Sequence, residues 1–290
     1  MAEQLFRGEL HVLRKVPFET TAAVRQSPDY SLFSFESRSH GFVAWNNRRP
    51  PFDDPRVRTA MTHAIHRKNI VAAEFSQRSK VAAAAVPSCF WASNRDIPPL
   101  PFDQDTARRL LREAGFAPGS TGVLERDGEP LAFELLSNQG HRTRADICED
   151  IRRRLEEIGV TVTVTLVPRR DLSVRVIREH SFDAALLGMN APTKVDLWPF
   201  FHSRSIGDGA NFAQYESPEV DALLERVRHV FDPAEAKKLW DEIQVIIHRD
   251  QPVTMLYEER GIAACNKRLQ NVRATIVSVY DNLPTWWFSD

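Results

Sequence analysis

Residues 41–67, GFVAWNNRRPPFDDPRVRTAMTHAIHR, form the stretch around which the rest of the chain is arranged. They predict an apolar strand, a polar turn, a Pro-Pro break and then a helix that begins near Pro55. Asp54 can cap that helix with its side chain, and a proline is tolerated at the first helical position because its missing N–H has no partner there. One face carries a stripe that we expect to be buried: Val57, Ala60, Met61, Ala64 and Ile65.

The same stretch resembles the signature of family 5 extracellular solute-binding proteins, the peptide, nickel and glycoside receptors of ABC importers. The matching residues are Asn46, Arg48, Pro50, Pro51, Phe52, Asp53, Asp54, Arg56, Val57, Arg58, Ala60, Ala64, Ile65 and Arg67. In that family the segment carries the chain from one lobe into the other. The resemblance implies an α/β, periplasmic-binding-protein-like fold (type II, cluster C). The chain would comprise one lobe of that fold together with parts of a second lobe.

Later segments resemble the same family in the same order, at residues 103–116, 215–224 and 232–244. Residues 5–13 resemble a segment that lies well inside the first lobe of family members. We therefore expect the chain to correspond to family members from a point within that lobe onward. The expected division makes residues 1–44 and 258–290 a remnant of the first lobe and residues 45–257 the second α/β lobe. Without most of the first lobe, we expect apolar residues such as Trp45, Trp286 and Trp287 to be exposed and to favour self-association.

Composition excludes some classes of partner. The chain has 290 residues, 42% hydrophobic and 27% charged, with a net charge of -1 and a pI near 6.8. Nucleic-acid binding needs concentrated basic charge, and the tightest run, Arg152 to Arg154, fits a solvated helix face. Three distant cysteines, Cys89, Cys148 and Cys265, fit neither a disulfide scaffold nor a zinc site. The N-terminus does not read as a secretory signal, and no apolar run approaches the ~20 residues of a membrane span, so the chain as written is expected in the cytosol.

Hydrophobic periodicity predicts alternating helices and strands. Helices are expected at 2–6, 67–75, 105–114, 142–158, 171–180, 217–229 and 232–249, and strands at 10–13, 30–35, 42–45, 160–167, 182–188 and 253–257. A hairpin with strands 122–125 and 130–136 should turn at Asp127-Gly128. Alternation of this kind implies parallel pairing through right-handed crossovers. The chain would pass between lobes near Trp45 and near Tyr257, and two passages define a hinge.

Motifs for catalysis are absent: the sequence holds no GxSxG, HExxH or P-loop pattern. A hydrolase would need Ser203 and His202 to face a buried carboxylate. His63 and His66 could in principle hold a metal, but they lie opposite the apolar stripe of their helix and are expected to be exposed. We therefore expect no enzyme activity, no cofactor and no metal.

Ligand-binding residues are expected where strand ends and connecting loops meet. Asn46 and Asn47 follow the strand that crosses between lobes and offer amide donors and acceptors, although they could simply cap the turn. Trp91, with Phe90, follows a loop that often approaches the cleft in the family, although both side chains could be core plugs.

The loop from Met189 to Arg204 is the main specificity candidate. In oligopeptide receptors of the family this loop carries an aspartate that pairs with the peptide's ammonium group, and Pro192 holds that position here. Free peptide N-termini are therefore doubtful ligands, unless Asp196 substitutes. The resemblance further implies Asn190 as a contact, Trp198 as an apolar wall and Asn211 as a polar contact.

The expected function is the solute-binding component of an ABC importer, which holds a peptide-like or other small solute between two lobes and delivers it to a permease. The resemblance implies a periplasmic or cell-surface location. The alternative is the ligand-sensing domain of a cytosolic transcriptional regulator with the same receptor fold. No nucleic-acid contact by this chain itself and no membrane span are expected.

Overall fold

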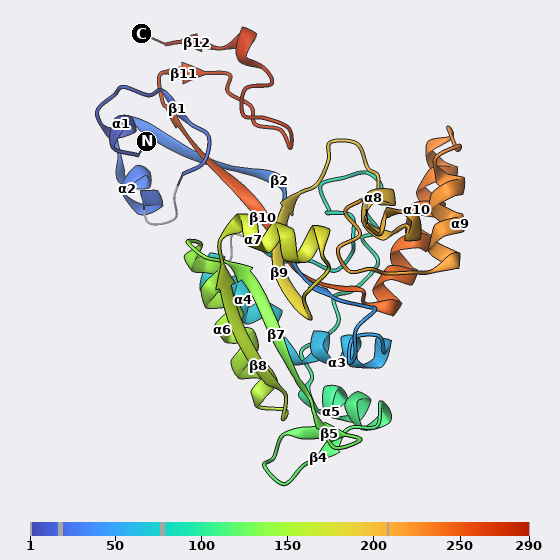
Figure 1. Cartoon of the computed structure of the whole chain (residues 1–290). Coiled ribbons are helices and arrows are strands. Elements are labelled where there is room, and N and C mark those ends of the chain that lie inside the picture. The colour runs from blue at the N-terminus through green and yellow to red at the C-terminus, as the bar shows by residue number, and fades with distance from the viewer. Residues whose placement is uncertain (1, 17–19, 76–78, 208, 290) are drawn as a thin grey trace. The chain divides into compact units, whose positions relative to one another are not determined.

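The computed structural model describes residues 2–16, 20–75, 79–207 and 209–289, and the chain divides into two compact units (Figure 1). Unit 1 consists of Met1–Ser39 with Glu259–Asp290, and unit 2 consists of His40–Glu258. Two long strands, β2 (Tyr30–Trp45) and β10 (Val253–Asn266), contribute residues to both units. No helix of the described residues is long and apolar enough to span a membrane.

The sheet of unit 2 follows the order β10, β2, β9, β7 and β8. β7 (Ala132–Asn138) pairs in parallel with β8 (Thr161–Val167) on one side and with β9 (Ala184–Asn190) on the other. The short β3 (Lys80–Val81) pairs antiparallel with β10. The expected α/β fold with parallel pairing is confirmed, and it brings the carboxyl ends of β7, β8 and β9 to one edge.

Helices start where the sequence provides caps. Asp54 accepts from the Arg56 amide at the start of α3 (Pro55–Ala64), and Asp103 caps α5 (Gln104–Glu113). Ser217 caps α9 (Pro218–Val227), and Asp232 caps α10 (Pro233–Asp250). The remaining helices of unit 2 are α4 (Arg67–Phe75), α6 (Arg142–Glu156), α7 (Arg169–Ser173) with the π-helical η2 (Val174–Arg178), α8 (Trp198–Phe201) and the 3-10 turn η3 (Ser203–Ser205).

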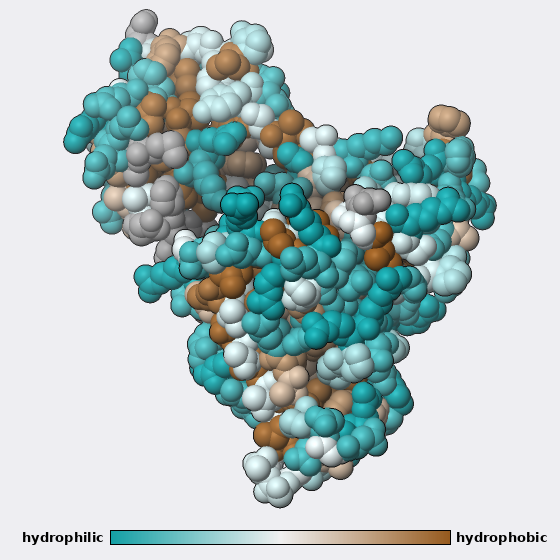
Figure 2. All heavy atoms as spheres, viewed as in Figure 1, coloured by the Kyte–Doolittle hydropathy of each residue, from teal (hydrophilic) through white to brown (hydrophobic). Residues whose placement is uncertain are grey.

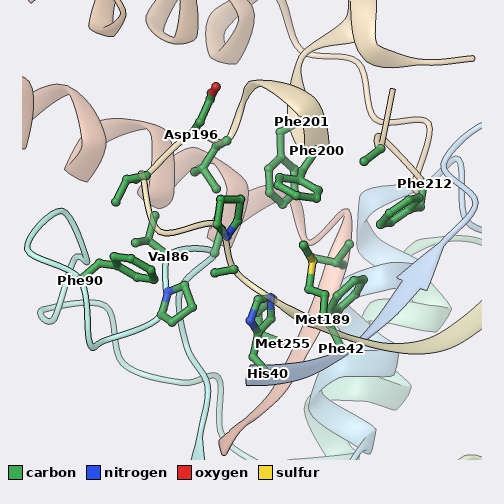
Figure 3. A pocket seen from close by; sticks show the side chains of 18 of the residues that line it. His40, Phe42, Val86, Phe90, Met189, Asp196, Phe200, Phe201, Phe212 and Met255 are labelled. Carbon is green, nitrogen blue, oxygen red and sulfur yellow. The ribbon is translucent and has the colours of Figure 1, made fainter. Parts of the chain in front are cut away.

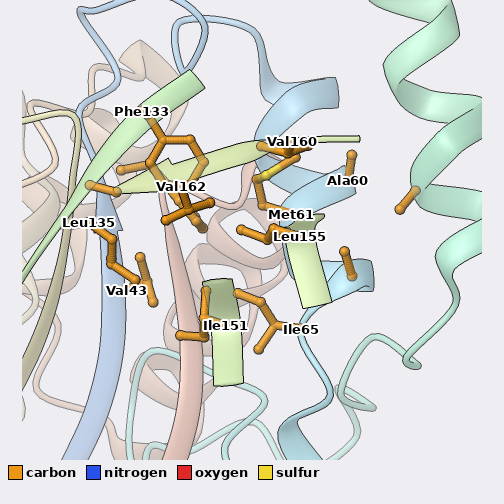
Figure 4. Close-up of a cluster of buried hydrophobic side chains, with 14 of the residues drawn as sticks. Val43, Ala60, Met61, Ile65, Phe133, Leu135, Ile151, Leu155, Val160 and Val162 are labelled. Atoms are coloured by element: carbon orange, nitrogen blue, oxygen red, sulfur yellow. The ribbon is translucent and has the colours of Figure 1, made fainter. Parts of the chain in front are cut away.

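The main core lies between the sheet and α3, α4, α5 and α6 (Figure 4). The predicted stripe of α3 is fully buried in it, and α6 contributes Ile147, Ile151 and Leu155. Val43 on β2 and Leu135 on β7 face the same cluster. Burying each of these side chains stabilises the fold by roughly 1.5–3 kcal/mol before entropy is counted.

Two arginines of residues 41–67 hold unit 2 together by donating hydrogen bonds to backbone carbonyls. Arg58 donates to the carbonyl of Phe52 at 2.7 Å and to that of Asp250, the last residue of α10, at 2.8 and 3.1 Å. Arg67 donates to the carbonyls of Ala82 and Met255. A buried carbonyl needs such a donor, so these arginines are structural parts of the lobe.

Two expectations about exposure are wrong. Trp45 is fully buried, and its indole donates to the Thr254 hydroxyl at 3.0 Å because β10 lies beside β2. His63 is buried and bonds the Pro101 carbonyl at 2.9 Å, while the His66 ring packs on Phe102. The proline-rich segment before α5 covers this face of α3, which amphipathic spacing alone could not reveal.

Several predicted element bounds also differ. The turn at Asp127-Gly128 is confirmed, but β5 (Leu124–Arg126) pairs only with β4 (Ala117–Pro118) and β6 (Glu129–Pro130). Residues 132–138 instead join the main sheet as β7, since their apolar side chains are buried there. The predicted break between strands 30–35 and 42–45 is continuous strand, and strand 253–257 runs on to Asn266.

Unit 1 has a small core of its own. The side chains of α1 (Ala2–Phe6), β1 (Val12–Leu13) and α2 (Thr21–Gln26) meet around Leu5, Leu13, Val24 and Tyr30. The C-terminal part adds β11 (Leu269–Gln270), the 3-10 turn η4 (Leu283–Thr285) and β12 (Trp287–Phe288). Hydrophilic residues cover most of the surface in Figure 2, where hydrophobic ones show as separate patches. Trp287 is 58% exposed, as expected, and Trp286 is half-buried.

Candidate functional site

A predominantly apolar cavity in unit 2 is the candidate ligand site (Figure 3). We call it the apolar cavity, and it encloses about 620 Å³, counting the part that opens to solvent. Aromatic, methionine and small side chains make most of its wall. Its lining residues are His40, Phe42, Ala85, Val86, Pro87, Phe90, Met189, Ala191, Pro192, Lys194, Val195, Asp196, Leu197, Phe200, Phe201, Ala210, Phe212, Ala213, Val253 and Met255.

The wall comes from strand ends and from three connecting segments. β2 supplies Phe42, the end of β9 supplies Met189, and the start of β10 supplies Met255. The segments 85–90, 191–201 and 210–213 close the cavity around these strands (Figure 3). The alanines in these segments are small and leave room between the rings. Cavities of this kind usually bind the apolar part of a small ligand, with few polar groups to orient it.

Asp196 is the one predicted ligand-binding residue that lines the apolar cavity. Its Oδ1 accepts from the Trp198 amide at 3.0 Å, and its carboxylate points away from the aromatic rings in Figure 3. Pro192, at the position of the family's ammonium-binding aspartate, also lines the cavity. No second carboxylate lines it among the described residues.

Four other predicted residues flank the lining without being part of it. Asn190 is exposed between Met189 and Ala191, and Trp91 follows Phe90 with 56% of its surface exposed. Asn211 is buried, where it donates to the carbonyls of His202 and Tyr215 and accepts from the Tyr215 amide. Trp198 stacks on His202 with ring centroids 3.5 Å apart, and the Arg228 guanidinium lies over its ring at 4.7 Å.

Asn46 and Asn47, in the turn after β2, do not line the cavity, although the Asn47 backbone N–H donates to the carbonyl of the lining residue Ala213 at 2.8 Å. Asn46 is fully buried and bonds the carbonyls of His180 and Phe182 and the side chain of Gln214. Asn47 donates to the carbonyls of Trp45 and Pro252, and its Oδ1 is buried without a partner among the described residues. Neither side-chain amide is thus part of the apolar wall.

Ser203 and His202 do not form a nucleophile–base pair. The Ser203 hydroxyl donates to Asp221, while His202 Nδ1 accepts from the Arg204 amide at 3.1 Å. His202 Nε2 is buried and has no hydrogen-bond partner in the described part of the chain. The serine proton is thus directed to Asp221, and His202 Nδ1 lies 3.7 Å from the same carboxylate. The described residues also contain no cluster of three or more His, Cys, Asp or Glu that could hold a metal.

The predictions missed most of the aromatic wall. Phe42, Phe200, Phe201, Phe212, Met189 and Met255 read in the sequence as ordinary core residues, and only their convergence in space makes a cavity. Phe200 and Phe201 gave the available signal, since a Pro-Phe-Phe run in a loop is too apolar to be solvated.

Comparison with known proteins identifies the relationship. The model of "Bacterial extracellular solute-binding proteins, family 5 Middle" matches residues 1–211. The oligopeptide-binding protein AppA of Bacillus subtilis is 29% identical over 99% of this chain and 53% of its own length. The glutathione-binding protein GsiB of Pectobacterium atrosepticum is 28% identical over 92% of this chain and 51% of its own.

Solved structures agree with these matches. The structure of B. subtilis AppA in complex with a nonapeptide has a TM-score of 0.86 and 27% identity, and the match covers 100% of this chain and 58% of AppA. The chain spans about half the length of the curated relatives that it matches.

Proposed function

The chain belongs to family 5 of the bacterial extracellular solute-binding proteins, and from this membership we propose that it binds a peptide-like or other small solute for an ABC importer. The observation that carries the proposal is the apolar cavity, which lies at strand ends and is lined mostly by aromatic, methionine and small side chains. The names of the two relatives, an oligopeptide-binding and a glutathione-binding protein, favour a peptide-like solute.

The proposal includes the domain division, location and partner expected from the sequence. Residues 45–257 act as one lobe, residues 1–44 with 258–290 act as part of another, and the chain hinges near Trp45 and Tyr257. The partner is an ABC permease, and the site of action is the periplasm or the cell surface. The names of the reported relatives give no support to the transcriptional-regulator alternative.

The ligand roles assigned from sequence to Asn46, Asn47, Trp91, Asn190, Asp196, Trp198 and Asn211 stay predictions. Phe42, Phe90, Met189, Phe200 and Phe212 are the residues that we propose contact the apolar part of the solute.

A neutral peptide tests the role of the apolar cavity. Isothermal titration of N-acetyl-Leu-Phe-amide should show binding to the wild-type chain. Ala210→Phe puts a ring into the cavity and should weaken binding at least about tenfold, because excluding one apolar side chain forfeits roughly 1.5–3 kcal/mol. Ala73→Phe adds the same ring to the exposed face of α4 and serves as the control, which should bind like wild type. Binding that Ala210→Phe leaves unchanged would exclude the cavity as the site.

A further inference from the structure

A second pocket of unit 2 lies at the carboxyl ends of the three parallel strands, and we call it the arginine pocket. Asn138 ends β7, Gly188 and Met189 lie near the end of β9, and Arg169 begins the helix that follows β8. This edge of a parallel sheet is where open α/β folds place their ligands. The lining residues are Phe42, Asn138, His141, Arg144, Arg169, Leu172, Ser173, Val176, Ile177, Leu187, Gly188, Met189 and Phe212.

Arg144 is the central cation of the arginine pocket. One of its terminal nitrogens donates to Asn138 Oδ1, and the other donates to the Gly188 carbonyl at 3.4 Å. Its Nε is buried and has no hydrogen-bond partner among the described residues. Gly188 leaves the space for this guanidinium, because a Cβ there would lie 2.5 Å from Arg144 Nη2. Asn138 and Gly188 thus hold the guanidinium in place with neutral groups.

No carboxylate balances this charge in the described part of the chain. Arg144 forms no ion pair there, whereas Arg152 on the same helix pairs with Glu149 and Glu156. The pocket also holds Arg169 and no acidic side chain. Arg169, Arg170 and Arg178 line an adjoining depression and likewise have no acidic partner among the described residues. A partly buried guanidinium that has no carboxylate partner among the described residues favours an anion from outside, since charge-assisted bonds are the stronger ones.

Phe42, Met189 and Phe212 line both pockets, so the arginine pocket and the apolar cavity adjoin across these three side chains. We propose that Arg144 binds a carboxylate of the solute while an adjacent bulky apolar group occupies the apolar cavity. The solute class is then a short peptide or other organic acid in which a free carboxylate neighbours a large apolar group. This proposal rests on the proposed function, and Arg144 is its specificity-determining residue.

A matched pair of peptides tests the proposal. Isothermal titration compares N-acetyl-Leu-Phe, which has a free carboxylate, with its C-terminal amide. Wild type should bind the acid at least about tenfold more tightly, as one charge-assisted hydrogen bond at a partly buried site provides. Arg144→Gln should reduce this preference to about twofold or less while the affinity for the amide stays the same.

Two further variants make the result specific. Arg142→Gln removes the same charge from the first turn of α6, where Arg142 is 96% exposed and lines neither pocket, and it should keep the wild-type preference. Gly188→Ala leaves every charge in place but displaces the guanidinium, so it should lose the preference as Arg144→Gln does. Circular dichroism verifies that each variant is folded.

The outcomes separate the two proposals. Equal binding of acid and amide by wild type, or a preference that survives in both Arg144→Gln and Gly188→Ala, would overturn the carboxylate site and leave the apolar cavity standing. If wild type bound neither peptide, the proposed function itself would be contradicted. If Arg142→Gln abolished the preference for the acid as fully as Arg144→Gln does, the preference would be a general charge effect, and a specific role for Arg144 would be refuted.

Discussion

Arg58 connects three parts of unit 2 through one side chain. Its guanidinium lies between the Pro-Pro turn before α3 and the end of α10, and it bonds carbonyls of both. Burial lowers the pKa of Arg58 to about 10, and the nearby Asp250 opposes that shift, so the group stays charged at neutral pH. The carbonyl of Asp250 belongs to the last turn of α10, which has no backbone donor of its own, so a cation there is favourable.

Replacing Arg58 with methionine should lower the free energy of unfolding by roughly 2–4 kcal/mol. The variant keeps part of the apolar stem but leaves the buried carbonyl of Phe52 and the partly buried carbonyl of Asp250 without the donors of Arg58, and each unsatisfied group costs about 1–3 kcal/mol. Urea unfolding followed by circular dichroism measures the loss. Arg109→Met is the matched control, because Arg109 forms only an exposed pair with Glu113 and should change stability by less than about 1 kcal/mol. Equal losses in the two variants would contradict the role given to Arg58.

Among the elements, α3 shows how a helix start is fixed. Asp54 accepts from the Arg56 amide at 2.8 Å and from the Arg56 side chain, directly before Pro55. Burial of the Asp54 carboxyl raises its pKa, but the bonds and charge of Arg56 together outweigh burial, so the pKa lies below its usual 3.8. The charged form of Asp54 therefore stabilises the folded state.

Asp54→Ala should lower the free energy of unfolding by about 1 kcal/mol at neutral pH, as loss of a helix cap does. Because the folded-state pKa is depressed, the contribution is fully present above pH 3.8 and is lost as the pH falls through the folded-state value. Unfolding curves for wild type and variant should therefore converge in acid. Asp53→Ala, at the exposed neighbouring position, should match wild type throughout. A stability difference that persisted undiminished in acid would exclude the charged cap as its cause.

Elements with capping signals could be predicted from the sequence, and elements decided by distant contacts could not. Asp54, Ser217 and Asp232 marked their helix starts correctly because a cap acts within one turn. The sequence predicts residues 130–136 as a hairpin strand because the turn signal is local, whereas the pairing of β7 (Ala132–Asn138) with β8 and β9 depends on distant contacts. Likewise, the predicted helix 171–180 is a short α-helix followed by a π-helix.

Across the whole molecule, the sequence predicted the segments of the site better than its residues. Met189, Phe90 and Phe212 line the apolar cavity, whereas the predicted residues Asn190, Trp91 and Asn211 are their immediate neighbours. Polar type is visible in a sequence, but the direction of a side chain within a loop depends on packing. The role proposed for Arg144 has no signal in the sequence for the same reason, because its lack of an acidic partner among the described residues appears only when the surrounding chain is in place.

The C-terminal part of unit 1 carries several exposed hydrophobic side chains: Val277, Tyr280, Leu283, Trp287 and Phe288. We expect concentration-dependent self-association, because exposed apolar side chains favour burial against a second copy. Trp287→Ser combined with Phe288→Ser should reduce the apparent mass in light scattering toward that of one chain. Phe231→Ser, which removes a 96% exposed ring from unit 2, should have little effect. A monodisperse wild-type monomer at all concentrations would refute this prediction.

Phe42, Met189 and Phe212 form the boundary between the apolar cavity and the arginine pocket. A solute that spans this boundary can bind in one orientation only. A peptide with the same composition but reversed residue order would place its apolar group and its carboxylate in the wrong pockets. Discrimination between solutes would then depend on the order of groups along the solute as well as on its size. The three boundary side chains would set the required distance between the carboxylate and the apolar group.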